Sequence, residues 1–269
     1  MTGFKLRMQT PRVLMPGRSA SDEAMDLVIE PGRRTVLMGR SGAGKTLLAR
    51  LALGQLPRSP VRVEGQVELY RADDRCMINL ADYPFGSTVP DLAALRGLEL
   101  SFVPQGGREN LVPGWSVRDH FDALLPAGAG AGGAGLEAAL ASMEALGVEP
   151  SADNLSAVAT GLSEGMIRRI LVALAMAQGA QVLVVDEPTT GLDPASRDAF
   201  RELLETRMLG SGAGVLLITH DVELAIQLGG ETLLVDHGTV VARTEDLAQG
   251  EGAFAPFIAA MQTGEGVLW

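Results

Sequence analysis

Short apolar runs alternate with helical patterns along most of this chain. Residues 35–38, 98–103, 181–185 and 215–219 form apolar runs of strand length. Apolar positions recur at helical spacing over residues 46–51, 165–178, 195–208 and 222–228. Strands that alternate with helices predict a mostly parallel sheet with helices on both faces, an α/β fold.

Other segments predict antiparallel pairing beside this sheet. Residues 61–69 alternate apolar and polar positions with a break at Glu64-Gly65, which predicts a two-strand edge. Residues 232–236 and 239–242 predict a hairpin that turns at His237-Gly238. Apart from a strand expected at residues 26–30, the first thirty residues are weakly patterned, and residues 71–98 give no clear pattern.

A helical insert is predicted between residue 106 and about residue 161. It begins with a loop over residues 106–113 and a short helix over residues 117–125. Apolar residues then recur at helical spacing at Leu136, Leu140, Met143 and Leu146. The Ala/Gly run at residues 127–135 predicts a flexible surface loop.

We therefore expect a single domain over residues 1–269 with two parts and a tail. The core takes residues 1–105 and 176–244, and the helical subdomain takes residues 106–175. The tail, residues 245–269, is expected to hold one or two helices.

Composition excludes several functional classes. The chain has 22 Lys and Arg against 33 Asp and Glu, a net charge of -11, without a basic run, which argues against nucleic acid as a partner. A single cysteine, Cys76, excludes a disulfide framework and a cysteine-clustered metal site. No signal peptide is expected, and no run approaches the ~20 apolar residues that span a bilayer. A role at a membrane would need another chain to supply the membrane part.

The strongest chemical signal is the segment from Gly39 to Thr46, which fits the phosphate-loop pattern G-x-x-x-x-G-K-[ST]. Its glycines let backbone N–H groups wrap a phosphate chain, Lys45 can reach the β- and γ-phosphates, and the Thr46 hydroxyl can coordinate Mg²⁺. The alternative is a glycine-rich turn that binds nothing. The expected ATP-binding residues here are Gly39, Arg40, Ser41, Gly42, Ala43, Gly44, Lys45, Thr46 and Leu47.

Two carboxylates follow the apolar run at residues 181–185. Asp186 is placed to hold Mg²⁺ through water, and Glu187 can polarise the water that attacks the γ-phosphate. The alternative is that both acids only cap a helix. After a phosphate loop we favour the catalytic interpretation.

With four motif segments besides the phosphate loop, the chain resembles the ATP-binding cassette (ABC) family over nearly its whole length. Residues 102–105 resemble the Q-loop, residues 186–193 resemble the Walker B end and the D-loop, and residues 218–221 resemble the switch-histidine segment. The signature motif, usually L-S-G-G-Q, corresponds to Leu162, Ser163, Glu164, Gly165 and Met166. The resemblance implies an ATPase with a P-loop NTPase core and a helical subdomain.

The resemblance also implies roles and partners. It implies ATP and Mg²⁺ as cofactors, with Gln105 sensing the ion and the attacking water, His220 contacting the γ-phosphate, and Asp193 in the D-loop. Catalytic roles fall on Glu187 and His220, and contacts to the ion fall on Thr46, Gln105 and Asp186. A second cassette would dimerise head to tail, so that each ATP lies between one phosphate loop and the partner's signature residues. Two transmembrane permease chains and, indirectly, an extracytoplasmic binding protein complete the assembly at the cytoplasmic side of the cell membrane.

Within the family, the closer likeness is to the peptide/nickel importer group. Residues 110–117 resemble the segment that faces the permease in that group, and the signature ends in Met166. The resemblance implies an importer for peptides, nickel or a similar small polar cargo. The alternatives are an accessory cassette of phosphonate breakdown, a regulatory cassette with low turnover, and a non-transport cassette such as those of DNA repair.

The chain departs from the family pattern in two places. Glu164 replaces a signature glycine: either it is a tolerated surface change, or its carboxylate repels the partner's γ-phosphate unless Arg168 or Arg169 neutralises it, which predicts an asymmetric heterodimer. No aromatic other than Phe4 precedes the first core strand, so Leu14, Met15 or Arg18 is expected to pack on the adenine. His120 is expected as an exposed helix residue and His237 as a turn residue.

Overall fold

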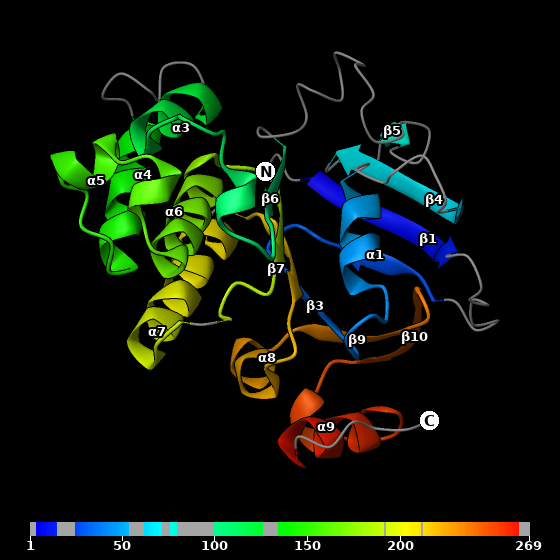
Figure 1. Cartoon of the computed structure of the whole chain (residues 1–269). Coiled ribbons are helices and arrows are strands. Elements are labelled where there is room, and N and C mark those ends of the chain that lie inside the picture. Colours follow the sequence, from blue (N-terminus) through cyan, green and yellow to red (C-terminus); the bar gives the residue numbers. More distant parts are fainter. Residues whose placement is uncertain are drawn as a thin grey trace.

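The computed structural model describes residues 4–14, 25–53, 62–71, 76–79, 99–125, 134–190, 192–210 and 212–263. Its larger sheet has six strands in the order β10-β9-β3-β8-β7-β6 (Figure 1). These strands are β3 (Arg34–Met38), β6 (Leu100–Val103), β7 (Val182–Asp186), β8 (Gly214–Ile218), β9 (Glu231–Asp236) and β10 (Thr239–Thr244). All neighbours are parallel except the β9–β10 hairpin, which confirms the predicted mostly parallel sheet.

A second sheet is fully antiparallel, with the order β2-β1-β4-β5. Its strands are β1 (Phe4–Leu14), β2 (Leu27–Ile29), β4 (Arg62–Arg71) and β5 (Cys76–Asn79). The expected break at Glu64-Gly65 was wrong, because β4 runs through both residues while pairing with β1. The irregularity lies in the partner strand, between Gln9 and Arg12.

The strand β1 was not predicted, although its first half carries the signal. Phe4, Leu6 and Met8 alternate with Lys5 and Arg7. Leu6 and Met8 are fully buried, which is the pattern of a strand with one face on a core.

Helices cover both faces of the parallel sheet (Figure 1). On one face α1 (Lys45–Ala52) packs together with the antiparallel sheet. On the other face lie α6 (Glu164–Ala177), α7 (Pro194–Leu203) and α8 (Val222–Leu228). Side chains of a strand point alternately to the two faces of the sheet, so β7 contributes to both cores. Val182 and Val184 point to the face covered by α1, and Leu183 and Val185 point to the face covered by α6, α7 and α8.

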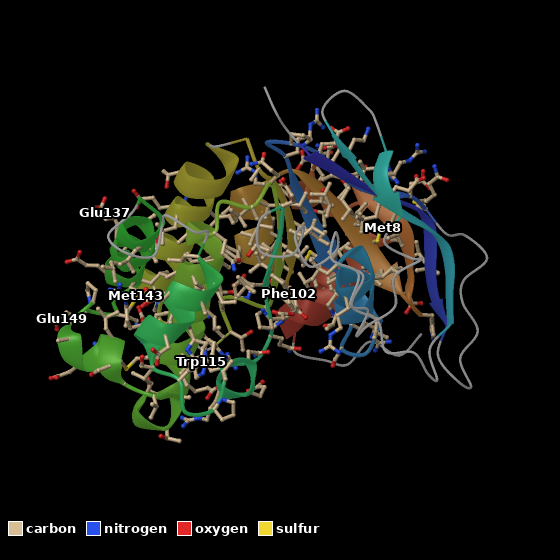
Figure 2. All side chains as sticks on the ribbon, turned by 90° about the horizontal axis from the view of Figure 1, so that it is seen from above. Met8, Phe102, Trp115, Glu137, Met143 and Glu149 are labelled. Carbon is tan, nitrogen blue, oxygen red and sulfur yellow. The ribbon has the colours of Figure 1, made fainter. Side chains whose placement is uncertain are left out.

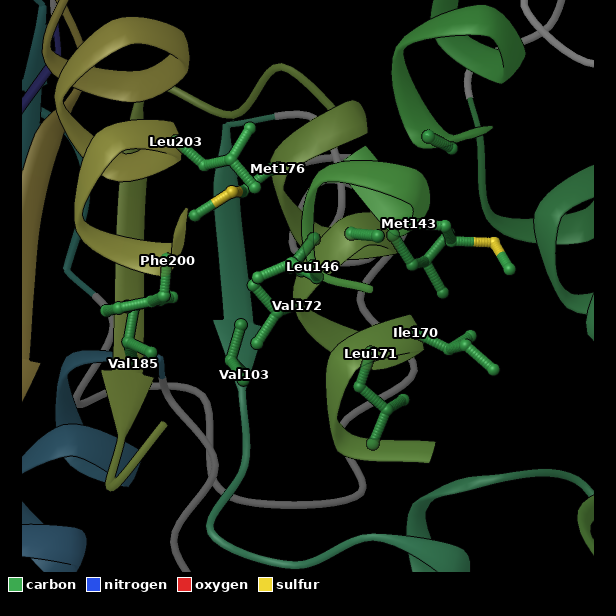
Figure 3. Close-up of a cluster of buried hydrophobic side chains, with 14 of the residues drawn as sticks. Val103, Met143, Leu146, Ile170, Leu171, Val172, Met176, Val185, Phe200 and Leu203 are labelled. Atoms are coloured by element: carbon green, nitrogen blue, oxygen red, sulfur yellow. The ribbon is translucent and has the colours of Figure 1, made fainter. Parts of the chain in front are cut away.

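The helical part packs onto α6. It contains α3 (Val117–Leu124), α4 (Ala134–Ala145), α5 (Ala152–Ser156) and the short 3₁₀ turns η2 (Arg108–Asn110) and η3 (Ala159–Gly161). Figure 3 shows Met143 of α4 and Leu146, which directly follows α4, beside α6, and Phe200 of α7 beside Val185 of the sheet. Figure 2 shows this core from above, with Met143 on the opposite side of the molecule from Met8. The Ala/Gly run lies mostly outside the described residues, and its last two positions begin α4.

The C-terminal segment forms η5 (Leu247–Gln249) and α9 (Phe254–Thr263). Phe254 and Phe257 share a buried cluster with Val36 and Met38 of β3, so the described part of the tail packs on the core. The predicted helix at residues 195–208 is α-helical only to Leu203, and its continuation, Leu204–Leu209, is a π-helix. Among the described residues no helix has the length and apolar character to cross a membrane.

The expectation for His120 was wrong. Its side chain is buried at 2 % exposure. Its Nε2 accepts the backbone N–H of Val112 at 2.9 Å, and its Nδ1 lies 2.7 Å from the carbonyl of Ser116. The ring also lies edge-on to Trp115, with centroids 5.3 Å apart. His120 therefore fixes the loop before α3, whereas His237 lies in the hairpin turn as predicted, with a φ of 45°.

Candidate active site

Four neighbouring strands of the parallel sheet carry the expected catalytic residues at their carboxyl ends. Gln105 follows β6, Asp186 ends β7, His220 follows β8, and Lys45 follows β3 through the phosphate loop. Because parallel strands end at the same edge of a sheet, these distant positions in the sequence meet at one place.

A pocket of about 560 Å³ opens at this edge. It is lined by Gly39, Ser41, Gly42, Gly44, Lys45, Thr46, Leu47, Gln105, Asp186, Glu187 and His220. Arg40 and Ala43, also expected to bind ATP, do not line it. Instead the Ala43 carbonyl accepts the N–H of Gly238 at 2.7 Å, which ties the phosphate loop to the β9–β10 turn.

The phosphate loop can be built only with glycine at its key positions. Gly39 has a φ of 152°, and a Cβ there would lie 2.4 Å from the Val235 carbonyl oxygen. Gly44 has a φ of 100°, and its Cβ would lie 2.8 Å from the Cα of Gly238. Gly44 also caps α1 without a side-chain hydrogen bond, so the first N–H groups of this helix face the pocket for an anion.

Lys45 bends back over the loop that precedes it. Its Nζ donates to the carbonyls of Gly39 at 2.8 Å and Arg40 at 2.9 Å. Burial lowers the pKa of Lys45, while the charges of Glu187 and Asp186 oppose that shift. The ammonium thus stands between the loop carbonyls and the two acids, where a polyphosphate would meet it.

Thr46 and Asp186 form a pair suited to a divalent cation. Thr46 Oγ1 donates to Asp186 Oδ2 at 2.7 Å, and Asp186 is 1 % exposed. Burial raises the pKa of Asp186; the Thr46 hydrogen bond opposes this and the charge of Glu187 adds to it. Asp186 Oδ1 is buried without a hydrogen-bond partner among the described residues. A buried carboxylate oxygen without a partner, beside a hydroxyl, is a donor set that fits Mg²⁺.

Glu187 and His220 face each other across the ends of β7 and β8. Glu187 Oε2 is buried 2.8 Å from His220 Nδ1, close enough for an ion pair, although the ring is not oriented to give this oxygen a hydrogen bond. The Glu187 backbone is left-handed, with a φ of 51°, and its N–H donates to the Ile218 carbonyl at 2.9 Å. Strain of this kind persists where the surroundings hold a residue for function.

The signature residues lie outside this pocket, at the start of α6. Leu162 is buried, and the Ser163 side chain caps the helix by accepting the Met166 N–H at 3.2 Å. Glu164 turns toward the loop after β6, where its Oε1 accepts the N–H of Arg108 at 3.3 Å. A Cβ on Gly107 would collide with this carboxylate, so the glycine makes room for it.

Neither Arg168 nor Arg169, the two cations considered as possible neutralising partners of Glu164, pairs with it. Arg168 donates to the Thr190 carbonyl at 2.6 Å, and Arg169 donates to the carbonyls of Gly165 and Leu146. The cation beside Glu164 is Arg108, whose Nε lies 3.9 Å from the carboxylate. Sequence analysis missed this residue because a contact 56 positions apart leaves no local pattern.

Asp193 also lies outside the pocket and caps α7. Its carboxylate accepts the N–H of Ser196 at 3.0 Å and the Ser196 hydroxyl at 2.7 Å. These hydrogen bonds lower the pKa of Asp193. Of the expected adenine contacts, Met15 and Arg18 and the side chain of Leu14 lie outside the described residues.

Comparisons with known proteins identify the family of this chain. The model of the ABC transporter family matches residues 23–190. The nickel import ATP-binding protein NikD of Brucella abortus is 30 % identical over 230 residues, which cover 85 % of this chain and 82 % of that protein. The zinc import ATP-binding protein ZnuC of Halorhodospira halophila is 31 % identical over 241 residues, covering 88 % of this chain and 76 % of that protein.

Solved structures of ABC proteins share the fold. An ATP-binding subunit of an ABC transporter superposes with a TM-score of 0.70 at 19 % identity, covering 96 % of this chain and 99 % of that one. The dimeric bacterial ABC transporter cassette MJ0796 superposes with a TM-score of 0.69 at 23 % identity, covering 89 % and 98 %. With the family matched over most of its length, this chain belongs to the ABC transporter family and is an ATP-hydrolysing cassette of that family.

Proposed function

We propose that this chain is the ATPase subunit of an importer for a small polar cargo such as nickel. The observation that carries the proposal is one pocket that joins a phosphate loop to Asp186, Glu187 and His220. The import proteins for nickel and zinc to which the chain is similar support import and favour a metal ion as cargo. A peptide cargo and a role in phosphonate breakdown remain the alternatives.

In this proposal each residue of the pocket has a distinct task. Backbone N–H groups of the loop and the Lys45 ammonium bind the β- and γ-phosphates. Thr46, Gln105 and Asp186 would hold Mg²⁺, which supplies charge neutralisation on those phosphates when bound. Glu187 accepts a proton from the attacking water, and His220, beside this carboxylate, orients toward the γ-phosphate.

The position of the signature motif supports a composite site. Ser163 and the first N–H groups of α6 lie outside the chain's own pocket, so their anion-binding end is available to ATP on a second cassette. The structure of MJ0796, to which this chain is similar, is a dimer. We therefore propose a dimer of cassettes, with the same chain or a different one as the partner.

A permease is the second proposed partner. Val112, Trp115 and Val158 keep large apolar side chains exposed near the segment 110–117. Val112 and Trp115 flank the buried His120 ring, and Ser116 bridges Val158, so the three residues share one firm surface (Figure 2 labels Trp115). We propose that this surface contacts transmembrane permease chains and that the cassette lies peripherally at the cytoplasmic side of the membrane. An extracytoplasmic binding protein would act only through the permease.

The test is Mg²⁺-dependent ATPase activity of the purified chain beside Glu187→Gln, with the exposed Glu144→Gln as the matched control. We expect both variants to bind ATP as the parent does, and only Glu187→Gln to lose turnover. ATP binding without turnover in the parent would indicate that a different partner cassette is required. No ATP binding, or turnover that survives Glu187→Gln, would refute the proposed function.

A further inference from the structure

The position of His220 depends on the residues on either side of it. The N–H of Thr219 donates to the Leu37 carbonyl at 3.2 Å, and its hydroxyl accepts the N–H of Asp221 at 3.0 Å. The imidazole itself is 55 % exposed and lies 2.8 Å from Glu187 Oε2. These hydrogen bonds hold the backbone on either side of His220, and so the point from which its ring extends toward Glu187.

Asp221 uses its two carboxylate oxygens for different partners. Oδ1 accepts the N–H of Leu224 at 3.0 Å and so caps α8. Oδ2 lies 3.5 Å from Arg197 Nη1, an ion pair with α7. A groove of about 370 Å³ separates these two helices, and Pro194, Arg197, Asp221 and Leu224 contribute to its lining. The ion pair therefore bridges a gap that apolar packing does not close.

Arg197 in turn is fixed to the D-loop. Its N–H donates to the carbonyl of Asp193 at 3.0 Å, within the first turn of α7. The Asp193 side chain caps that turn through Ser196. A displacement of the D-loop would carry the Arg197 backbone, and so the base of its side chain, with it, because Asp193 and Arg197 are hydrogen-bonded within one helical turn.

We propose that Arg197 is a positioning residue for His220. By holding Asp221, it couples the D-loop to the histidine that faces Glu187. The inference rests on the proposed hydrolysis by the Glu187–His220 pair, and it assigns that pair a dependence on α7. In a dimer of cassettes, the position of the D-loop would then influence the rate of ATP hydrolysis in this chain's own site.

The first test needs no turnover. The chain has only 3 histidines, so ¹³C-histidine NMR with assignment by single His→Ala variants resolves each ring. Arg197→Gln is expected to shift the His220 resonance and to leave those of His120 and His237 unchanged. Arg201→Gln is the matched control, because Arg201 lies one turn further along α7 and pairs with Glu205 at 3.8 Å.

The second test is steady-state kinetics of the assembled ATPase. Arg197→Gln and Asp221→Asn should each lower kcat about threefold to fivefold, with KM for ATP unchanged, because a half-exposed ion pair contributes modestly and neither residue touches the phosphate loop. Asparagine keeps an oxygen for the α8 cap, so both variants remove only the ion pair. The double variant should lose no more than either single one, and Arg197→Lys should recover part of the loss.

Two outcomes would overturn the inference. One is an unshifted His220 resonance in Arg197→Gln. The other is that Arg197→Gln lowers the activity of His220→Ala by the same factor as it lowers that of the parent. A residue that acts through His220 cannot act in its absence. If instead the assembled ATPase, with its partner cassette present, hydrolyses no ATP with the parent chain or any variant, the proposed function fails, while the NMR result still decides the positioning role.

Discussion

Glu164 and Arg108 connect the start of α6 to the loop that follows Gln105. The Arg108 backbone N–H donates to the Glu164 carboxylate at 3.3 Å, and its guanidinium donates to the Leu162 carbonyl at 3.0 Å. The residue that departs from the family signature is thus partly neutralised by a neighbour from another segment.

Because the two residues pair, the effect of Glu164 on ATP turnover should depend on Arg108. In the assembled ATPase, Glu164→Gly should raise the turnover of the site that this signature completes by about threefold or more, since like charges a few ångströms apart repel strongly. Arg108→Gln should lower that turnover because the carboxylate loses its cation, and the double variant should behave as Glu164→Gly alone. ATPase assays with the four proteins check this; unchanged rates in Glu164→Gly would mean a tolerated surface change and would remove the argument for an asymmetric heterodimer.

The same variants should scarcely affect folding. The two side chains are 44 % and 49 % exposed, and a surface ion pair contributes below about 1 kcal/mol. Urea unfolding of Glu164→Gly provides this control for the kinetic result.

Asp186→Asn should increase stability while it abolishes Mg²⁺-dependent hydrolysis. Burial raises the pKa of Asp186, so the folded chain binds this proton more tightly than the unfolded chain. The free energy of unfolding therefore falls as the pH rises from the ordinary value of 3.8 through the raised pKa. Without Mg²⁺ at neutral pH, Asp186→Asn should unfold with about 1 kcal/mol more free energy than the parent, because the buried charge is gone.

Asp193→Asn should remove a contribution to the free energy of unfolding whose pH dependence is opposite to that of Asp186. Hydrogen bonds from Ser196 lower the pKa of Asp193, so its contribution is present above the ordinary pKa and is lost as the pH falls through the lowered one. Urea unfolding of both variants from pH 3 to pH 8 compares the two signs. A parallel pH dependence in the two variants would contradict the burial argument for Asp186.

Gly44→Ala should impair nucleotide binding far more than Gly42→Ala. Both glycines have positive φ, so alanine strains the backbone by about 1 kcal/mol at either position. Only at Gly44 would the added Cβ also meet the Gly238 backbone, at 2.8 Å, whereas at Gly42 it would meet nothing within 4 Å. Titration with a fluorescent ATP analogue should show the larger loss of affinity for Gly44→Ala; equal losses would mean that the hairpin turn does not shape the loop.

His120→Phe should destabilise the chain by about 1 to 3 kcal/mol, because the partly buried Val112 N–H loses its acceptor. His120→Gln keeps an acceptor and should cost less. Urea unfolding distinguishes the two variants, and similar losses would indicate that ring packing, not the hydrogen bond, accounts for the stability. A permease-binding assay on the same two variants would test whether the His120 ring is needed to hold the exposed Trp115 side chain in place for binding.

Sequence patterns predicted the elements whose periodicity is long and regular. The apolar strands β3, β7 and β8 and the helices α6 and α8 lie within a residue or two of the expected bounds. The strand β1 was missed because Pro11 interrupts its alternation, and the weaker signal before it was not used. The π-helix after Leu203 has no periodicity of its own that could have separated it from α7.

The pocket was largely predictable, while its supports were not. Motif spacing gave Lys45 and Asp186, and the family resemblance gave His220; each lies at the end of a strand of one sheet, and the strand ends converge. The buried state of His120 depends on a tertiary contact with Val112, which no spacing encodes. The sequence offered only Arg168 and Arg169, neighbours on the same helix, as possible partners of Glu164, since helical neighbours are the ones that a sequence pattern displays.

The order of the strands leaves the β6 side of the ATP site less firmly held than the rest. Among the described strands, β7, β8 and β3 are each hydrogen-bonded on both sides, whereas β6 pairs with β7 alone. The chain after β6 leads through Gln105 directly into the helical part. We propose that Gln105 would act as a hinge ligand: a rotation of the helical part would withdraw it from the pocket, while the three inner strands would keep the phosphate loop, Asp186 and His220 in register.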